Sequence, residues 1–206
     1  MITDQIISRG IKNISVIAVM SEIPRHLFIH RSNQALAYSD QPVPIGYGQT
    51  ISQPYIVAYM TELLKVEAHH KILEIGTGSG YQAAILSKIA KEIFTIEIIP
   101  ELGELALSNF KELGYNNITT RIANGYKGWV ENAPFDRIIL TAAPEQIPKE
   151  LIAQLKPNGR MVLPLGPRWT NQKLLVLKKN SLGKIIQEKK IPVRFVPMVK
   201  EYIKNN

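Results

Sequence analysis

The fold of this chain is decided by the stretch Lys71-Ile-Leu-Glu-Ile-Gly-Thr-Gly-Ser-Gly-Tyr81. It begins with a short apolar run and continues with three alternating glycines, the pattern of a buried strand that ends in a tight turn. Glycine adopts positive φ angles and has no side chain to hold a ligand away, so the backbone can lie close to a cofactor. Ser79 and Gln82 have the spacing of a capping box, which predicts a helix beginning at Gly80 or Tyr81. This order of elements predicts a nucleotide-type pocket at the carboxyl end of a sheet.

The spacing of the glycines distinguishes between two kinds of nucleotide pocket. A dinucleotide fingerprint has the pattern G-x-G-x-x-G and places a pyrophosphate on the helix N-terminus. Here the third glycine comes one residue early, and an acid, Glu74, precedes the first glycine. An acid that faces the pocket would repel a pyrophosphate but would suit a cation. The motif Glu-x-Gly-x-Gly-x-Gly resembles the first motif of S-adenosylmethionine-dependent methyltransferases, whose cofactor carries a sulfonium and an ammonium group.

The composition is typical of a globular protein of one domain. The chain has 206 residues, of which 45% are hydrophobic and 20% are charged, enough to bury a core. It has no cysteine, which excludes disulfides, thiol catalysis and cysteine-based zinc sites. Its four histidines follow none of the usual metal-binding spacings, so we predict no metal site.

The formal net charge of +8 is compatible with a nucleic-acid partner. Because the basic residues are spread along the chain, we interpret them as solvated surface and predict no nucleic-acid partner. The apolar run from Val16 to Met20 is too short to span a bilayer and lacks the layout of a signal peptide. We therefore expect a cytoplasmic protein without a membrane partner. The sequence does not give the oligomeric state, and we favour a monomer.

Predicted strands and helices alternate from residue 71 to residue 164. The strands are expected at 71–75, 93–96, 118–122, 136–141 and 160–164, with helices at 81–90, 100–113 and 148–155. This alternation predicts an α/β fold, a Rossmann-like and mostly parallel sheet with helices on both faces. Two further strands, 174–178 and 185–195, form a hairpin and complete a seven-stranded sheet, at least one of them antiparallel.

An N-terminal helical extension precedes this core. Residues 1–21 are predicted to form two helical pieces with a break at Gly10, and residues 54–64 an amphipathic helix. Residues 40–54, rich in proline and glycine, predict a long irregular segment of the kind that is often functional. We divide the single domain, residues 1–206, into the extension with a substrate loop (1–53), a cofactor-binding core (54–164) and closing strands with a substrate edge (165–206).

An acid stands where the ribose of a nucleoside is expected. Glu97 ends the second predicted strand of the core, 21 positions after Gly76. An acid about 20 residues beyond the first glycine, at the carboxyl end of a strand, can accept both ribose hydroxyls. The alternative is an acid that ends a strand by chance.

Five stretches of the sequence together carry a family resemblance. They are Pro24-Arg-His-Leu-Phe28, Pro44-Ile-Gly-Tyr-Gly-Gln-Thr-Ile-Ser-Gln-Pro54, Leu73-Glu-Ile-Gly-Thr-Gly-Ser-Gly-Tyr-Gln-Ala83, Phe135-Asp136 and Val193-Arg-Phe-Val-Pro-Met198. With these stretches, the chain resembles the bacterial protein-L-isoaspartate (D-aspartate) O-methyltransferases over nearly its whole length. The glycine motif is shared by many methyltransferases, whereas residues 50–54 and 193–197 are much more specific. This resemblance implies methyl esterification of the free α-carboxylate of L-isoaspartyl residues, a step in the repair of aged proteins, with S-adenosylmethionine as cofactor.

The resemblance also implies roles for individual residues. Ser52 is the expected active-site residue, whose hydroxyl would hold the acceptor carboxylate with backbone N–H groups of residues 49–53; it could also cap the helix before Pro54. The expected cofactor-binding residues are Glu74, Gly76, Thr77, Gly78, Ser79, Gly80, Tyr81, Glu97, Asn124, Gly125 and Thr141. The expected substrate-binding residues, for isoaspartyl proteins and peptides, are Gln49, Thr50, Ile51, Gln53, Arg194 and Val196.

Two places depart from the family pattern. Asn124 stands where the family usually has an aspartate that contacts the adenine edge, and its amide can both donate and accept hydrogen bonds. The segment 166–170 is less glycine-rich than usual and contains Trp169, which either packs inside or contacts ligand at the rim.

Three other interpretations stay open at this stage. A methyltransferase that acts on RNA or a small molecule would explain the charge of +8, but Thr141-Ala-Ala-Pro144 stands where an N-P-P-Y-type motif would be expected. A nicotinamide oxidoreductase conflicts with the early third glycine and with Glu74. A peptide-binding module without catalysis conflicts with the intact glycines and Glu97.

Overall fold

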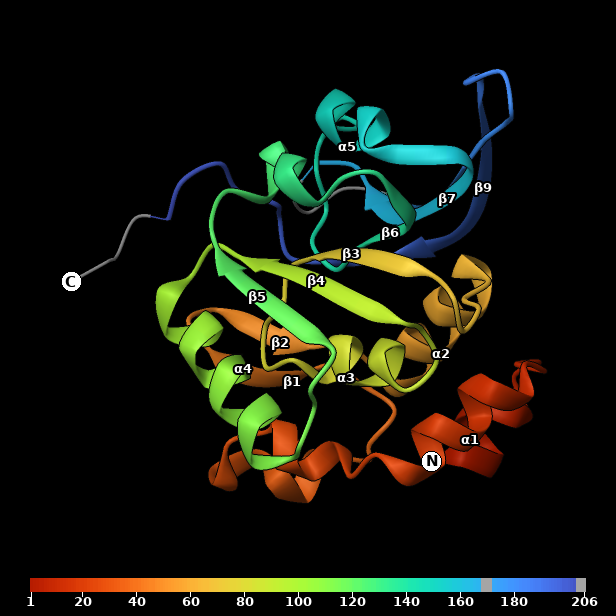
Figure 1. Ribbon diagram of the computed structural model, residues 1–206. Coiled ribbons are helices and arrows are strands. Elements are labelled where there is room, and N and C mark those ends of the chain that lie inside the picture. Colours follow the sequence, from red (N-terminus) through yellow and green to blue (C-terminus); the bar gives the residue numbers. More distant parts are fainter. Residues whose placement is uncertain (168–171, 203–206) are drawn as a thin grey trace.

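The computed structural model describes residues 1–167 and 172–202 and has the predicted α/β architecture (Figure 1). Its large sheet has the order β5-β4-β3-β6-β7-β8-β9. The first five strands in this order, from β5 across to β7, run parallel to one another, and β8 is antiparallel to both β7 and β9. The predicted mostly parallel, seven-stranded sheet is confirmed. Trp169 lies outside the described residues. The strands are β3 Lys71–Ile75, β4 Glu92–Glu97, β5 Ile118–Ile122, β6 Phe135–Leu140, β7 Leu155–Leu165, β8 Gln172–Lys179 and β9 Ile185–Val193.

Helices cover both faces of the sheet, as predicted. On one face, α2 (Pro54–Leu64), α3 (Tyr81–Ser87) and α4 (Pro100–Glu112) pack on side chains such as Ile72 and Ile139. On the other face, α5 (Lys149–Ala153) packs on Leu73 and Ile138, next to the 3₁₀ turns η4 (Gly125–Lys127) and η5 (Val130–Asn132). Because successive side chains of a strand point to opposite faces, a strand buried on both sides is mainly apolar, as the run before Gly76 is apart from Glu74.

The N-terminal extension lies on the helices and not on the sheet. It consists of η1 (Ile2–Ile7), α1 (Ile14–Glu22), η2 (Arg25–Phe28) and η3 (Arg31–Leu36), with the predicted break at Gly10, whose φ is 91°. Its buried apolar residues contact Val57 of α2 and Ile85 of α3, and α1 lies on the outer side of these helices in Figure 1. The extension therefore builds a third layer from which residues 25–53 reach the carboxyl edge of the sheet.

Residues 43–51 form a β-hairpin, so the expectation of an irregular segment there is wrong. Strands β1 (Val43–Gly46) and β2 (Gln49–Ile51) pair antiparallel through a two-residue turn, Tyr47-Gly48. Both turn residues have positive φ, 54° and 68°, as a type I′ turn requires. Sequence patterns missed it because the strands are short and Pro44 interrupts the first of them.

Several element ends also differ from the predictions. The capping box is wrong: the N-cap of α3 is Gly80 without a side-chain hydrogen bond, and the amide of Gln82 donates to the Thr61 hydroxyl of α2 (2.9 Å). Helices α3 and α5 are shorter than expected. Strand β7 begins at Leu155 and not at the expected residue 160. Residues 156–159, predicted as a turn before the strand, form an irregularity within it, with Asn158 at φ 61°.

Candidate active site

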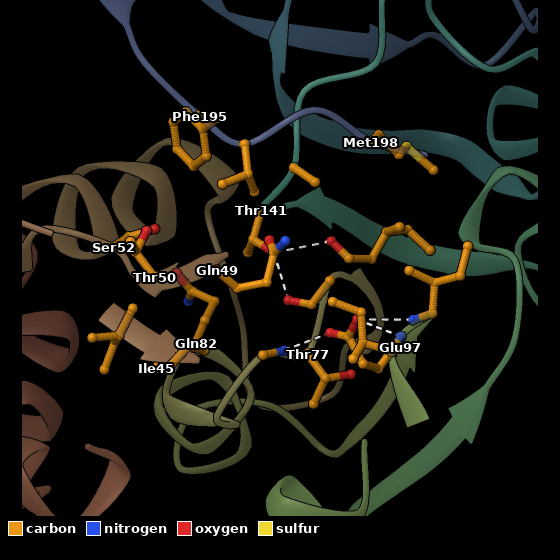
Figure 2. Close-up of a pocket in the computed structure, with 18 of the residues that line it drawn as sticks. Ile45, Gln49, Thr50, Ser52, Thr77, Gln82, Glu97, Thr141, Phe195 and Met198 are labelled. Atoms are coloured by element: carbon orange, nitrogen blue, oxygen red, sulfur yellow. Dashed lines mark hydrogen bonds between the residues drawn. The ribbon is translucent and has the colours of Figure 1, made fainter. Parts of the chain in front are cut away.

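A cavity of about 570 Å³ opens at the carboxyl ends of β3, β4 and β6. The chain continues from β3 to β4 and β5 on one side and returns to place β6 on the other, so this is the point where the strand order reverses. Such crevices are the usual ligand sites of open α/β sheets. Figure 2 shows Thr77 and Glu97 on one side of the cavity, Ser52 and Thr50 of the hairpin region on another, and Thr141 between them.

Most predicted cofactor residues line this cavity. They are Gly76, Thr77, Gly78, Ser79, Tyr81, Glu97, Gly125 and Thr141. Glu74, Gly80 and Asn124 do not line it. Gly80 instead lies against Phe110 of α4, where an added Cβ would be 2.5 Å from the ring.

The turn after β3 is closed by backbone and side-chain contacts around Gly76. Its N–H donates to the carbonyl of Ile96 (2.8 Å), and its φ is 97°. The Thr141 hydroxyl donates to the carbonyl of Gly76 (2.5 Å), and an added Cβ at Gly76 would lie 2.3 Å from that hydroxyl. Only glycine therefore fits here, both by backbone conformation and by space.

Glu97 organises the loops on both sides of the cavity. Its Oε2 accepts the N–H of Gly78 (2.8 Å), and its Oε1 accepts the N–H groups of Ile98 (2.9 Å) and Ile99 (3.0 Å). The side chain lines the cavity at 5% exposure. Because a carboxylate has about four acceptor positions, Oε2 keeps room for a ligand hydroxyl. The ribose contact itself stays a prediction.

Glu74 does not face the cavity, in contrast to the reasoning from sequence. It is fully buried in the sheet, where Oε2 accepts from the hydroxyl of Thr95 (2.5 Å), which in turn hydrogen bonds the hydroxyl of Thr77 (2.6 Å). Its Oε1 is buried without a hydrogen-bond partner among the described residues. Burial, helped by the nearby charge of Glu97 and opposed by the Thr95 hydrogen bond, raises the pKa of Glu74 to about 8. The acid is therefore neutral at pH 7, and it reaches the turn after β3 through the hydroxyls of Thr95 and Thr77.

A pH-dependent stability follows from this burial. The folded-state pKa of Glu74 is about 8, above its ordinary 4.5, so its contribution to stability is complete below about pH 4.5 and is lost as the pH rises through 8. We expect Glu74→Gln, which stays neutral, to match the wild type at pH 5 and to exceed its Tm by about 3–6 °C at pH 9. Thermal melts from pH 5 to 9 measure this, with the exposed Glu104→Gln on α4 as control. Parallel curves for the wild type and Glu74→Gln would contradict it.

Asn124 uses both ends of its amide within the protein. Its Oδ1 accepts the N–H of Tyr126 and caps η4, and its Nδ2 donates to the carbonyl of Lys200, each at 2.8 Å. The hydroxyl of Tyr126 donates to the carbonyl of Met198 (3.1 Å). Asn124 thus fastens the C-terminal segment beside the cavity, and its expected direct contact with adenine is not supported by its position. The adjacent Gly125 does line the cavity, and an added Cβ there would lie 2.3 Å from Ile75.

We expect Asn124→Asp to loosen the C-terminal segment. The carboxylate still accepts from Tyr126 but faces the Lys200 carbonyl without a proton to donate. Losing one such hydrogen bond costs about 1 kcal/mol, so amide hydrogen exchange in residues 198–202 should become roughly fivefold faster. Asn180→Asp is the matched control, since that Oδ1 accepts from Leu182 and Lys184 while its amide nitrogen donates to no described residue. Unchanged exchange in 198–202 would show that this bond does not hold the segment.

Ser52 and most of the expected substrate-binding residues also line the cavity. Gln49, Thr50, Ile51 and Ser52 line the cavity, and so do Arg194 and Val196. Gln53 does not line it, because its amide donates to the carbonyl and the carboxylate of Asp40 (3.0 and 2.8 Å).

Ser52 has a free side chain at this wall. The N-cap of α2 is Gln53, which removes the alternative of Ser52 as a cap. The Ser52 hydroxyl makes no hydrogen bond with any described residue, although its carbonyl accepts one from Arg25. The hydroxyl is therefore available to a ligand.

The C-terminal wall is an extended segment held on one side. The carbonyl of Val196 accepts from the N–H of Ala143, and the N–H of Met198 donates to the carbonyl of Ala143, each at 2.8 Å. The N–H of Val196 has no partner among the described residues. The predicted role of this segment as a substrate edge stays a prediction, and this N–H, which could bond a peptide backbone, is the group that supports it.

Sequence reasoning missed part of the lining. Ile98 and Ile99 follow Glu97 directly and could have been inferred from it, because the chain must cross the cavity after that strand. Met198 and Tyr202 carry no local signal, since they are brought in by a pairing with the chain after β6. Ile45 and Tyr47 come with the unforeseen hairpin.

The sequence predicts neither a metal site nor a membrane partner. In the described part of the chain, Glu67, His69 and His70 form one group that could surround a metal ion, but they precede β3 and none lines the cavity. The Nδ1 of His70 already accepts the N–H of Glu67 (2.8 Å). The absence of a metal site stays a prediction. No helix within residues 1–167 and 172–202 is long and apolar enough to cross a membrane.

Comparison with known proteins agrees with this geometry. The family model of protein-L-isoaspartate(D-aspartate) O-methyltransferase matches residues 1–202. A protein-L-isoaspartate O-methyltransferase of Gloeobacter violaceus is 48% identical over 201 residues, 98% of both chains, and one of Picosynechococcus is 52% identical over 96% of this chain and 88% of its own. A Plasmodium falciparum structure described as such an enzyme, in complex with S-adenosyl-L-homocysteine, has a TM-score of 0.83 at 26% identity and covers 97% of both chains. The chain therefore belongs to the protein-L-isoaspartate(D-aspartate) O-methyltransferase family.

Proposed function

We propose that this protein transfers a methyl group from S-adenosylmethionine to the free α-carboxylate of L-isoaspartyl residues in damaged proteins and peptides. Membership of the family over residues 1–202 supports the reaction and its substrate class. The observation that carries the proposal is a single cavity shared by the glycine turn with Glu97 and by Ser52 with Arg194. A donor bound at the first wall and a carboxylate bound at the second would meet in the same enclosed space.

The residues of the first wall fit the cofactor. Gly76 and Gly78 leave the backbone uncovered, and Glu97 offers an acceptor position to a ribose hydroxyl. The acidic residues that line the described cavity are Glu97 and Glu201 and the basic one is Arg194, which favours a cationic ligand. When bound, this cofactor supplies a methyl group activated by the positive charge of its sulfur.

The acceptor needs no general base. An α-carboxylate has a pKa near 3.3–3.7, so it is ionised at neutral pH. With the cofactor bound, a carboxylate oxygen would form the new bond to the methyl carbon as the bond from that carbon to sulfur breaks, and no proton would move. The protein must therefore place the oxygen in line and exclude water, which can lower the barrier by roughly 7–11 kcal/mol. The Ser52 hydroxyl can donate to the desolvated carboxylate, and Arg194, which also lines the cavity, adds positive charge.

Two peptides that differ in one linkage test the proposal. Methyl transfer from labelled S-adenosylmethionine is measured to a peptide with L-isoaspartate and to the same peptide with L-aspartate. We expect transfer to the isoaspartyl peptide alone. Transfer to neither peptide, with S-adenosylhomocysteine still bound, would overturn the acceptor and would redirect the search to RNA and small molecules.

Replacing Ser52 with alanine tests the acceptor wall separately. Losing a hydrogen bond to a charged group costs about 1.5–3 kcal/mol, so we expect kcat/KM for the isoaspartyl peptide to fall at least roughly tenfold. The affinity for S-adenosylhomocysteine, measured by calorimetry, should stay unchanged. Ser21→Ala, whose hydroxyl bonds the carbonyl of Ile17 within α1, is the control. Full activity in Ser52→Ala would remove this hydroxyl from the mechanism.

A further inference from the structure

Arg25 is a buried cation without an acidic partner. Its side chain is fully buried under the Ser52 wall of the cavity, although it does not line the cavity itself. It forms no ion pair with any described residue, and its Nη1 is buried without a hydrogen-bond partner. Burial lowers the pKa of Arg25 to about 10, so the group stays charged at neutral pH. Burying an unpaired charge is costly, and a purely structural contact would not need one.

The guanidinium joins three segments that meet at the cavity. Its Nε donates to the carbonyl of Ala37, and its Nη2 donates to the carbonyl of Ser52, each at 2.7 Å. Its Cζ lies 4.9 Å from the centre of the Tyr81 ring, at the first residue of α3. Because Tyr81 directly follows the glycine turn, Arg25 fixes the backbone of Ser52 relative to that turn. These two walls must be in register for an in-line transfer.

A neutral hydrogen-bond donor could bind the same two carbonyl groups, so hydrogen bonding alone does not explain why a charged residue is buried here. At the Ser52 wall the proposed ligand is an anion, the acceptor carboxylate. A positive charge directly behind this wall lies in a medium of low dielectric, where it attracts an anion more strongly than an exposed charge does and is screened less by salt. The unpaired state of Arg25 is then useful, because an acidic partner would cancel its field.

We propose that Arg25 is a positioning residue of the methyl transfer, which fixes the Ser52 backbone and supplies a buried positive charge to the acceptor carboxylate site. This inference rests on the proposed function, since it needs an anionic acceptor. The guanidinium touches neither substrate nor cofactor and acts through the wall that it supports.

Two substitutions separate the charge from the geometry. Arg25→Met keeps much of the apolar length and removes the charge, whereas Arg25→Lys keeps the charge but cannot reproduce the planar fork that reaches two carbonyl groups. Arg160→Met is the matched control. Arg160 also donates to a backbone carbonyl, that of Leu63 (2.9 Å), but it lies where β7 pairs with the amino end of β6, away from the cavity. For each variant we would measure kcat and KM for the isoaspartyl peptide, the Kd of S-adenosylhomocysteine and the Tm.

We expect Arg25→Met to raise KM about tenfold and to lower kcat about tenfold, with the Kd within about threefold of the wild type. Arg25→Lys should keep KM near the wild-type value and lower kcat about fivefold. The rise in KM in Arg25→Met should persist at 0.5 M salt, because a buried charge is weakly screened. Arg160→Met should lose some stability without a change in KM.

Other outcomes would overturn the inference. One is an unchanged KM in Arg25→Met. Another is a KM that rises above the wild-type value by the same amount in Arg25→Met and Arg25→Lys. A third is the same kinetic losses in Arg160→Met. If Arg25→Met does not fold, Arg25→Lys decides: a lower kcat at constant KM supports the inference, and wild-type kinetics or a raised KM overturns it. If the wild type itself does not methylate the isoaspartyl peptide, the proposed function fails, which is distinct from a failure seen only in the variants.

Discussion

Replacing Glu97 with glutamine is expected to weaken the binding of S-adenosylhomocysteine about 100-fold or more. The carboxylate accepts three backbone N–H groups, from Gly78, Ile98 and Ile99. An amide in its place turns an NH₂ group toward at least one of these donors in either orientation, and it removes the charge that strengthens the others. Each hydrogen bond to a charged group contributes about 1.5–3 kcal/mol, and 1.4 kcal/mol is tenfold in affinity.

Calorimetric titration measures this effect directly. Glu92→Gln is the matched control, because Glu92 begins the same strand at the edge opposite the cavity. It should bind S-adenosylhomocysteine like the wild type. A Kd for Glu97→Gln within threefold of the wild type would show that neither the loop contacts nor the proposed ribose contact depends on this carboxylate.

Gly76→Ala should remove measurable binding of S-adenosylhomocysteine and lower the Tm by about 5 °C or more. At φ 97° an alanine is strained, and its Cβ would lie 2.3 Å from the Thr141 hydroxyl. That hydroxyl is held by the carbonyl groups of Ile75 and Gly76. The turn must therefore move away from β6, which displaces the cavity wall.

Two further variants separate strain from collision. Gly114→Ala has a similar φ of 74° but nothing within 4 Å of the added Cβ, so it should show the cost of strain alone and leave binding unchanged. In Gly76→Ala/Thr141→Ala the colliding hydroxyl is absent, so the double variant should be more stable than the sum of the two single effects. Thermal melts measure both variants. If the Tm changes of the two single variants simply add in the double variant, the collision with the Thr141 hydroxyl does not destabilise Gly76→Ala.

The sheet was predictable because its signals are local and repeated. The central parallel strands β3, β4 and β6 consist largely of buried apolar residues, and Gly76 and Glu97 mark the ends of two of them. Their meeting at one cavity follows from the topology alone, since parallel strands end at the same edge. The hairpin at 43–51 was not predictable in this way, because its turn places Tyr47 at φ 54° without the usual asparagine–glycine signature.

Side-chain directions were the main limit for the site. Glu74 stands one residue away from a strand end, and the alternation of the strand turns it into the sheet toward Thr95. Gln53 and Asn124 carry the right chemistry for ligands, yet nearby backbone groups, at Asp40 and Lys200, use their amides. Such competition depends on segments distant in sequence, and no periodicity reports it. Arg25 is the converse case, a charged residue whose full burial no local pattern indicates.

Strand β9 has a consequence for how the protein behaves at high concentration. It forms the last strand of the sheet, where unpaired backbone groups could recruit a strand from another molecule. Its sequence opposes this, because Lys189 and Lys190 place charges along the edge and Pro192 has no N–H to donate. Glu188 pairs with Lys178 and Lys190 and adds further charge that would have to be desolvated. Growth of the sheet into fibrous aggregates is therefore disfavoured at this edge.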